Sequence, residues 1–516
     1  MNQPESPATR PVPTSPAGWP GDPPGAPPAP ADGAPDPGSP RARLFALVAC
    51  LILVPTVVIL NQIEAMAEPA APTSAFHADG MDPVSLVGKM AIKIEQWGKS
   101  MGTPSANAPT WMSQLDSSAT GPADKLRIAV AAAELVGPDQ AKERLEALDA
   151  SLASGTYRGT VPAPGPELSA DELAALNTDI DSLQRVYSGD AGTLSEDERT
   201  GLKTRFGWWG ELALTYGLPD TDPTRAGLLG GGPRLITTLF AAGGVFLIWT
   251  LGAIAAFIAM LVMISSGRIK RRFVPPAPGG SVYLETLAIF VGGFLALQFI
   301  PAIVALAIGG PPPTSVSLGL QWVLVLTPFW PLLRGVSFSH HRRLIGWHSG
   351  RGVFREIGCG VLAYFAGLPL LVVALVVTLI LMVLYQYLRG AMGAPQGQPH
   401  NPIVDILMSG DPLVLVMLFL LASVWAPFVE ESIFRGGFYR HLRARYAVPL
   451  CAVASALVFG VMHGYQFLML LPVITLGFVF ALMREWRGSL IAPITAHALH
   501  NGTILAIVIS LLTALR

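Results

Sequence analysis

Long apolar segments recur along this chain and constrain its fold more than any other feature. The first is "RARLFALVACLILVPTVVIL", and a series of others follows residue 233. About 20 apolar residues cross a bilayer as a helix, and the lipid interior admits only helices or closed barrels. We therefore predict an all-α polytopic membrane bundle of about nine spans, placed near residues 41–61, 235–264, 283–308, 316–333, 357–388, 412–438, 449–463, 467–483 and 490–515.

Composition agrees with a membrane protein. Only 13% of the residues are charged, and the mean hydropathy is +0.49. These values are typical of integral membrane proteins. The formal net charge of −1 gives no reason to expect a nucleic-acid partner. The lipid bilayer is the partner that the composition predicts.

The cysteines exclude two ways of stabilising the polar part of the chain. All three, Cys50, Cys359 and Cys451, lie in apolar segments, and no CxxC pattern occurs. The polar segment therefore contains no disulfide framework. A metal ion, if one is bound, has to be held by histidines and carboxylates.

The N-terminal region divides into a tail and an anchor. Residues 1–40 are dense in Pro, Ala and Gly, a composition that predicts disorder. Residues 41–61 read as a transmembrane anchor. A cleaved signal peptide is the alternative, because "AMA" at Ala65–Ala67 fits an A-x-A cleavage site. The long preceding tail favours the uncleaved anchor.

Residues 62–233 are more polar and predict a helical domain outside the membrane. Two capping boxes indicate helix starts, one from Ser169 to Glu172 and one from Ser195 to Glu198. No catalytic constellation occurs in this segment, and its sequence predicts no function for it.

The charge of the loops between the apolar segments, which we call joints, predicts the membrane topology. The basic joints "GRIKRRF", "SHHRRLIGWHSGRGVFR", "YRHLRARY" and "REWRG" alternate with weakly charged ones such as "GGPPPTS". The positive-inside rule then places the N-terminus in the cytosol and residues 62–233 outside it, as expected for a bacterial cytoplasmic membrane protein. We divide the remainder into accessory helices, 234–411, and a core, 412–516. The short segment 449–463 is also compatible with a re-entrant element.

Ionisable residues interrupt three of the apolar segments: "EESIFR" at 430–435, "FGVMH" at 459–463 and "HALHN" at 497–501. Such residues are rare at membrane depth and are functional by default, although polar side chains also join helices in membrane bundles. At 1.5 Å per residue, each cluster lies about 15 to 21 Å from a cytosolic helix end. The three clusters are therefore expected to converge in the cytosolic half of the membrane.

Helical spacing assigns partners within the first cluster. Glu431 and Arg435 stand at i and i+4, the favourable order for an ion pair. Glu430 is left without a partner on its own helix. Adjacent residues of a helix point about 100° apart, so we expect Glu430 and Glu431 not to face the same site.

The other two clusters supply histidines. Phe459 precedes His463 by one helical turn, so its ring is placed to pack against the imidazole. His497 and Asn501 share one helix face, and His500 is offset from it by about 60°. Glu430 with two of the histidines is a zinc ligand set with an open position, although the HExxH spacing is absent.

The order of these motifs resembles a known family. ExxxR within "EESIFRG", then FxxxH, then HxxxN on successive apolar segments is similar to the CPBP (Abi) family of CAAX prenyl proteases and bacteriocin-processing proteins. The stretch "RGSLIAPITAHALHN" also resembles the last family motif with its lead-in. The resemblance covers residues 412–516 and includes neither the tail nor the polar domain.

The resemblance implies hydrolysis of a peptide bond in a membrane-associated or prenyl-type peptide. Glu430 would be the general base with His463 beside it, and His497 and Asn501 would stabilise the oxyanion. Glu431 and Arg435 would orient the helix of Glu430. The family has been described both as zinc metalloproteases, for which Glu430, His463 and His497 would be the ligands, and as metal-independent glutamate proteases.

Two other functions remain open at this stage. An ion- or proton-coupled transporter also needs buried ionisable residues. Carriers of this kind often contain internal repeats, however, and the earlier spans contain no second copy of the motifs. The other alternative is a non-catalytic membrane scaffold, against which the intact motifs argue.

Overall fold

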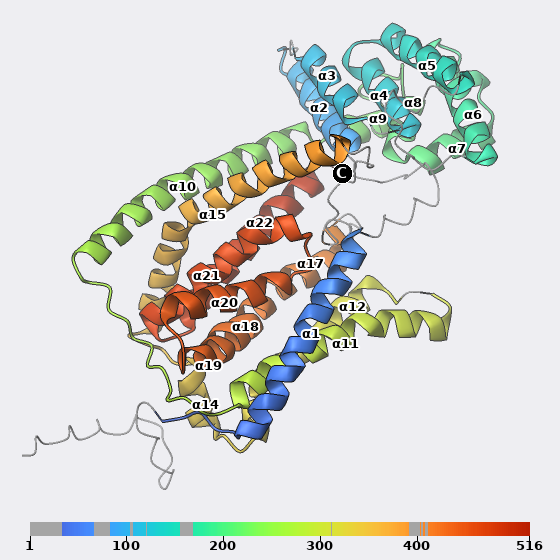
Figure 1. Ribbon diagram of the computed structural model, residues 1–516. Coiled ribbons are helices and arrows are strands. Elements are labelled where there is room, and N and C mark those ends of the chain that lie inside the picture. The colour runs from blue at the N-terminus through green and yellow to red at the C-terminus, as the bar shows by residue number, and fades with distance from the viewer. Residues whose placement is uncertain are drawn as a thin grey trace, which may run out of the picture.

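The computed structural model describes residues 34–66, 83–103, 107–119, 121–154, 169–310, 312–391, 403, 406–407 and 411–515. A long helical bundle carries a smaller helical domain at one end (Figure 1). The regular elements of the described residues are all helices, apart from an isolated bridge between Pro35 and Ala277. The prediction of an all-α fold is confirmed.

Eight helical stretches among the described residues are long and apolar enough to cross a membrane. Their elements are α1 (Pro40–Met66), α10 (Gly232–Ser265), α11 (Val282–Ile308), α12 (Thr314–Gln321) with η3 (Trp322–Phe329) and α13 (Trp330–Leu333), α15 (Val353–Ala391), the broken helix from α17 to α19, α21 (Leu470–Arg487) and α22 (Ile491–Leu515). The polytopic membrane bundle is thus confirmed, and the chain is an integral membrane protein.

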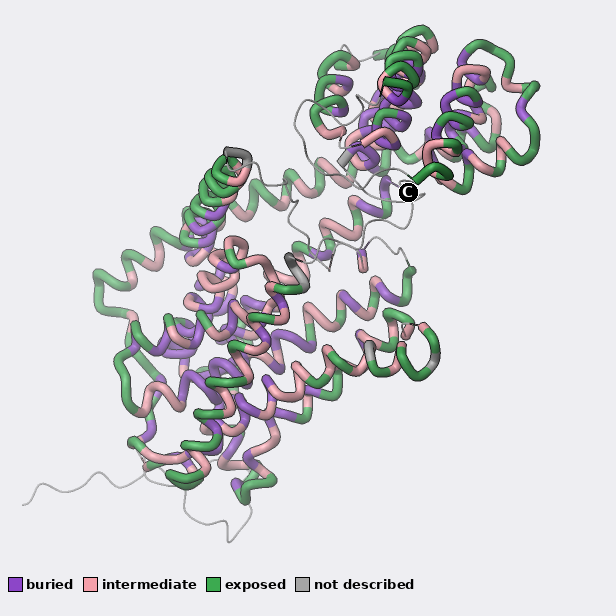
Figure 2. Tube along the Cα trace, turned by 45° about the vertical axis from the view of Figure 1, so that its right-hand side comes forward, coloured by how far each residue is buried: buried purple, intermediate pink, exposed green. Residues whose placement is uncertain are grey.

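The ninth expected span is a shorter helix. α20 (Val448–Val461) has 14 residues, which corresponds to about 21 Å of helix against a hydrocarbon core of about 30 Å. It packs along α21 and against α1. Figure 2 shows buried residues gathered on the inner faces of the bundle, with exposed residues along its outer helices. The exposed side chains of α10 include Phe240 and Phe246, as expected for a surface facing lipid.

The helix that carries the glutamates is broken twice. It consists of α17 (Pro412–Leu420), the π-helical turn η4 (Leu421–Trp425), α18 (Ala426–Glu430), a second π-helical segment η5 (Glu431–Phe438) and α19 (Tyr439–Arg443). Pro427 has no N–H to donate and therefore interrupts the α-helical ladder after η4. Glu430 is thereby placed between two π-helical segments, which occur frequently at functional sites.

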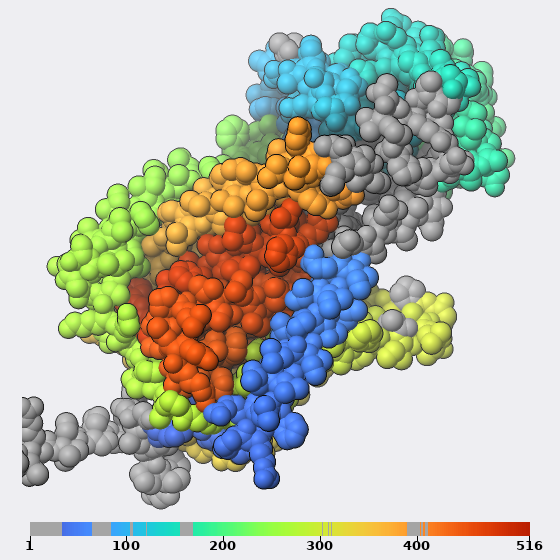
Figure 3. All heavy atoms as spheres, viewed as in Figure 1, coloured from blue at the N-terminus to red at the C-terminus, as the bar shows by residue number. Residues whose placement is uncertain are grey.

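Helix α1 is an integral part of the bundle. It packs along α11 and also contacts α20, and Figure 3 shows it lying beside the C-terminal helices on one face. These contacts fit the predicted anchor; Ala67 of the alternative cleavage site lies outside the described residues.

The prediction of a disordered tail over residues 1–40 is wrong for its last residues. Residues 1–33 lie outside the described residues, but residues 34–39 contact the membrane bundle. The carbonyl of Pro37 accepts a hydrogen bond from Ser281 N at 3.0 Å, and Asp36 forms a 2.9 Å ion pair with Arg440. Composition alone did not reveal these contacts, because their partners lie far along the chain.

The polar domain is a helical bundle with its own apolar core. Both predicted capping boxes are present, with Ser169 and Ser195 each exchanging hydrogen bonds with the glutamate three residues later. Its helices are α2 (Pro83–Ser100), α3 (Ala108–Ser118), α4 (Pro122–Leu135), α5 (Pro138–Ala153), α6 (Ala170–Tyr187), η2 (Ala191–Thr193), α7 (Glu196–Phe206), α8 (Trp208–Leu214) and α9 (Pro223–Leu229). α2 joins the domain to α10 and α22.

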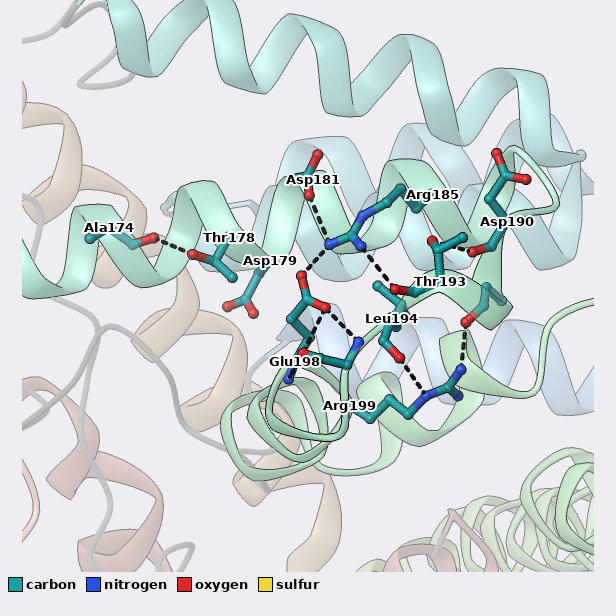
Figure 4. Close-up of polar contacts among 12 residues, drawn as sticks. Ala174, Thr178, Asp179, Asp181, Arg185, Asp190, Thr193, Leu194, Glu198 and Arg199 are labelled. Atoms are coloured by element: carbon teal, nitrogen blue, oxygen red, sulfur yellow. Dashed lines mark hydrogen bonds and ion pairs between the residues drawn. The ribbon is translucent and has the colours of Figure 1, made fainter.

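Two arginines connect α6 and α7 in different surroundings. Arg185 pairs with Asp181 and Glu198 (Figure 4), and all three side chains are partly exposed to solvent. Arg205 pairs with Asp179, whose side chain is fully buried; Arg205 Nε lies 2.7 Å from Asp179 Oδ2. The two pairs differ mainly in the burial of the carboxylate.

This difference predicts unequal effects of removing the two arginines. Arg205→Met should destabilise the domain by about 3 to 5 kcal/mol, because it leaves a buried carboxylate unpaired. Arg185→Met should cost about 1 kcal/mol or less, because exposed pairs are weak. Hydrogen exchange of α6 and α7 in the detergent-solubilised chain measures both, and equal protection in the two variants would contradict the prediction.

Candidate active site

Glu430 lies between two histidines from different parts of the chain. Its Oε2 atom is 4.0 Å from His463 Nε2 and 4.0 Å from His497 Nε2. The Oε2 atom is buried and has no hydrogen-bond partner among the described residues. The structure therefore brings together the three residues that the sequence placed at one depth.

His463 follows the end of α20 and is held by the last turn of that helix. Its Nδ1 lies 2.8 Å from the carbonyl oxygen of Phe459. A carbonyl only accepts, so Nδ1 carries the hydrogen, and Nε2 of the neutral ring presents its lone pair toward Glu430. The Phe459 ring packs edge-on against the imidazole, with centroids 4.6 Å apart.

His497 is buried in α22 and contacts both glutamates. Its Nδ1 lies 3.0 Å from Glu431 Oε1, and its Nε2 faces Glu430. The two glutamates thus contact opposite sides of one imidazole, in keeping with the expectation that they do not point into the same site. The helical spacing holds, and the imidazole lies between the two carboxylates and meets each with a different ring nitrogen. The Phe480 ring stacks on the imidazole and fixes its plane, with centroids 5.3 Å apart.

Glu431 and Arg435 form a fully buried pair. Arg435 Nη1 lies 2.9 Å from Glu431 Oε1, and both side chains are 0% exposed. Arg435 also donates to the carbonyl of Gly477 at 3.1 Å. A Cβ at Gly477 would lie 3.0 Å from the guanidinium, so glycine permits this close approach of α21. The guanidinium also lies over the face of Phe459, 4.1 Å from its centroid.

Two further polar residues of α22 point elsewhere. Asn501 Nδ2 donates to the carbonyl of Ala422 in η4 at 2.8 Å. Its side-chain hydrogen bond within the described chain goes to this carbonyl and not to Glu430 or the two histidines. His500 Nδ1 lies 3.2 Å from the hydroxyl of Tyr364, as its offset on the helix suggested.

The expected zinc ligands do not match a zinc site in this arrangement. Two donors on one tetrahedral zinc lie about 3.4 Å apart, given bonds of about 2.0 to 2.2 Å. The Glu430 oxygen is 4.0 Å from each imidazole nitrogen. Within the described residues, no group of three His, Cys, Asp or Glu side chains is placed to hold a metal ion.

Comparison with known families supports the resemblance drawn from the motifs. Residues 412–503 match the family model described as type II CAAX prenyl endopeptidase Rce1-like. The chain carries an Rce1-like domain. The match supports a membrane endopeptidase in general and favours the enzyme over the transporter and scaffold alternatives. Comparison with curated proteins and with solved structures finds no match.

A contact from outside the Rce1-like domain holds the loop after His463. Gln62 of α1 donates from Nε2 to the carbonyl of Tyr465 at 2.9 Å, and its Oε1 accepts from the Phe467 amide at 3.2 Å. Gly464, in the same loop, has a φ of +71°, a conformation that favours glycine. Gln62 was not predictable from the sequence, because no local pattern links it to a loop 403 residues away.

The buried pair predicts a strongly non-additive double-mutant cycle. Glu431→Gln and Arg435→Met should each destabilise the chain by about 3 to 5 kcal/mol, because each leaves its partner as an isolated buried charge. The double variant should lose less than the sum of the two. Unfolding in detergent measures the cycle, with Arg334→Met, which removes a partly exposed pair with Glu285, as the mild control. Additive losses would show that the pair does not interact.

The Gln62 contact predicts a local change in backbone protection. Gln62→Leu should raise the hydrogen-exchange rate of the Phe467 amide about fivefold, as expected for the loss of a hydrogen bond worth about 1 kcal/mol. Thr56→Ala is the matched control, because Thr56 lies on the same helix and bonds only to Ile52 of α1. An unchanged rate in Gln62→Leu would show that α1 does not hold this loop.

Proposed function

We propose that the chain is a glutamate-dependent endopeptidase that cleaves a membrane-associated or prenyl-type peptide, with Glu430 as the general base. The observation that carries this proposal is the position of Glu430 Oε2, 4.0 Å from two imidazole Nε2 atoms. Serving as a base requires a carboxylate that is not held by a guanidinium, whose charge is permanent. The neighbouring Glu431 is paired with Arg435, whereas Glu430 faces the histidines.

The distances suit a bridging water. Two polar atoms that share one water, each at about 2.8 Å from it, lie about 4.0 to 4.6 Å apart. Both gaps around Glu430 Oε2 are 4.0 Å. A water bound here donates one proton toward Glu430 and the other toward the lone pair of His463 Nε2. This orients its oxygen for attack on a substrate carbonyl.

His497 is the proposed oxyanion donor. In its protonated form the imidazole donates Nδ1–H to Glu431 and directs Nε2–H into the site. Glu431 balances the imidazolium charge, as the carboxylate behind a catalytic histidine does in other hydrolases. A donor in a site where water is scarce stabilises a developing oxyanion more than the same donor in water.

Asn501 is a second candidate donor. One of its two amide hydrogens bonds to Ala422, and the other is available for the oxyanion after a small rotation of the side chain. This part of the proposal rests on the family motif, because the Asn501 side chain is hydrogen-bonded to Ala422 and not to the other site residues.

The proton balance needs no additional group. The carboxylate of Glu430 takes a proton from water as the new C–O bond forms, giving a tetrahedral intermediate. It then returns that proton to the leaving amine as the C–N bond breaks. In this scheme His463 helps to bind the water, Glu430 deprotonates it, and His497 stabilises the oxyanion. No step requires zinc, and the donor distances argue against zinc in this arrangement.

The side on which the substrate enters follows from the predicted topology. Three elements lie at the end of the bundle away from the polar domain: α14 (Phe338–Ile345), α19 and the start of α1 (Figure 1). The basic joints are at that end, which the positive-inside rule assigns to the cytosol. We propose that substrate peptides reach Glu430 from the cytosolic leaflet.

Replacing the base tests this function. Glu430→Gln should lower kcat for a farnesylated C-a-a-X peptide by at least about 10³-fold, because an amide cannot take the proton from water. The experiment uses the purified chain in detergent micelles, with cleavage followed by mass spectrometry. Unfolding of the variant should remain close to that of the unaltered chain.

His500→Gln is the matched control, since His500 lies on the helix of His497 but bonds to Tyr364; this variant should keep its activity. Activity should also survive a strong chelator. Undiminished cleavage by Glu430→Gln would remove Glu430 from the mechanism, and loss of activity on chelation that added zinc restores would replace the metal-free scheme.

A further inference from the structure

A second polar site lies at the end of the bundle remote from the polar domain. It is a cavity of about 220 Å³ whose charged lining comes from Asp36, Arg272, His340, Arg343, Arg440 and Arg484. These residues come from the segment before α1, the loop after α10, α14, α19 and the last turn of α21. Four of the six lie outside the Rce1-like domain, and neither the sequence motifs nor the proposed mechanism uses any of them.

The described lining of this basic cavity carries more positive than negative charge. Among the described residues it contains four arginines and one carboxylate. That carboxylate, Asp36, is engaged by Arg440, with Nη2 at 2.9 Å. The described part of the lining therefore has an excess of positive charge, which low-dielectric walls focus into the cavity.

Arg484 is a buried arginine for which the described residues provide no counter-ion. It is 2% exposed, and its Nε has no hydrogen-bond partner among the described residues. Its other nitrogens donate to two backbone carbonyls, of Leu344 at 3.0 Å and of Gly488. Within the described chain no carboxylate lies within ion-pair distance of it. Because a guanidinium stays charged and is costly to bury without a counter-ion, an anion in the cavity beside it would stabilise this arrangement.

The rim of the cavity is electropositive as well. The pKa of His340, which lies in α14 outside the spans, is lowered by burial and further by Arg343 and Arg440, with Asp36 acting in the opposite direction. The second lining histidine, His348, uses both ring nitrogens on backbone groups. The positive charge at this rim therefore comes from Arg343 and Arg440, and neither histidine adds to it.

We propose that this cavity binds a phosphate group, supplied by the headgroup of an anionic phospholipid or by free phosphate. Guanidinium groups recognise phosphate through paired N–H donors. The cavity also lies where the spans end, since Arg440 and Arg484 belong to the last turns of two membrane stretches. Basic pockets between membrane helices at this depth are suited to lipid headgroups. The proposal does not depend on the peptidase mechanism.

The test uses two double variants that remove the same charge from the same two elements. Arg272→Gln with Arg343→Gln alters the lining of the cavity. Arg271→Gln with Arg342→Gln alters the adjacent arginines, which are exposed and do not line it. Arg484→Gln is kept as a supplementary variant, because removing a buried arginine can by itself prevent folding.

Thermal unfolding of the full chain is measured in nanodiscs of phosphatidylcholine alone, of phosphatidylcholine with phosphatidylglycerol, and of phosphatidylcholine with added inorganic phosphate at constant ionic strength. We expect a rise in Tm with phosphatidylglycerol or with phosphate. Titration of the effective ligand should show at least a tenfold loss of affinity in the Arg272/Arg343 variant and little change in the Arg271/Arg342 variant.

A response to phosphatidylglycerol alone identifies a lipid headgroup, and a response to inorganic phosphate alone identifies the free ion. Both results support the site. The proposal is overturned if neither ligand raises Tm, or if the two double variants respond equally, which would indicate only a general attraction of basic loops for anions.

Discussion

One carboxylate oxygen connects the helices of the site. Glu431 Oε1 accepts from Arg435 on its own helix and from His497 on α22, and Arg435 extends the connection to α21 through Gly477. Because these groups are buried, each would be strongly destabilising without its partners. These buried groups therefore have their partners only when the helix of Glu431 packs against α21 and α22 as it does here. The position of His497 relative to Glu430 follows from that packing.

The same interaction explains why two adjacent glutamates differ in role. Glu431 is fully buried and compensated by a guanidinium, so it is held as a fixed negative charge. Glu430 lies one residue earlier, at the end of α18 and before the π-helical segment η5, and its carboxylate meets imidazole nitrogens at a distance suited to a shared water. A single helix thus supplies a structural carboxylate and the carboxylate that we propose as the base.

Local spacing predicted much of the fold and part of the site. Apolar length located the spans, and i, i+4 spacing predicted the pairing of Glu431 with Arg435. Contacts between distant segments were not predictable in this way: His497 reaches Glu431 across 66 residues, and Asp36 reaches Arg440 across 404. Nothing local distinguishes Asp36 from the other residues of a proline-rich tail. Its role depends on a buried arginine that only the packed bundle places beside it.

The position of α1 shows how an element outside the protease domain contributes to the site. Residues just before α1 are fastened to Arg440 and Ser281 at one end of the bundle, and Gln62 is fastened to the loop after His463 near the other end of the helix. α1 has 27 residues in all, and a helix of that length is about 40 Å long. The loop after His463 contains Gly464, which adopts a left-handed backbone conformation. Gly464 has no side chain whose packing could hold the loop in place. The amide of Gln62 supplies that restraint by binding both a donor and an acceptor of the loop backbone, so the orientation of His463 depends on α1 as well as on α20.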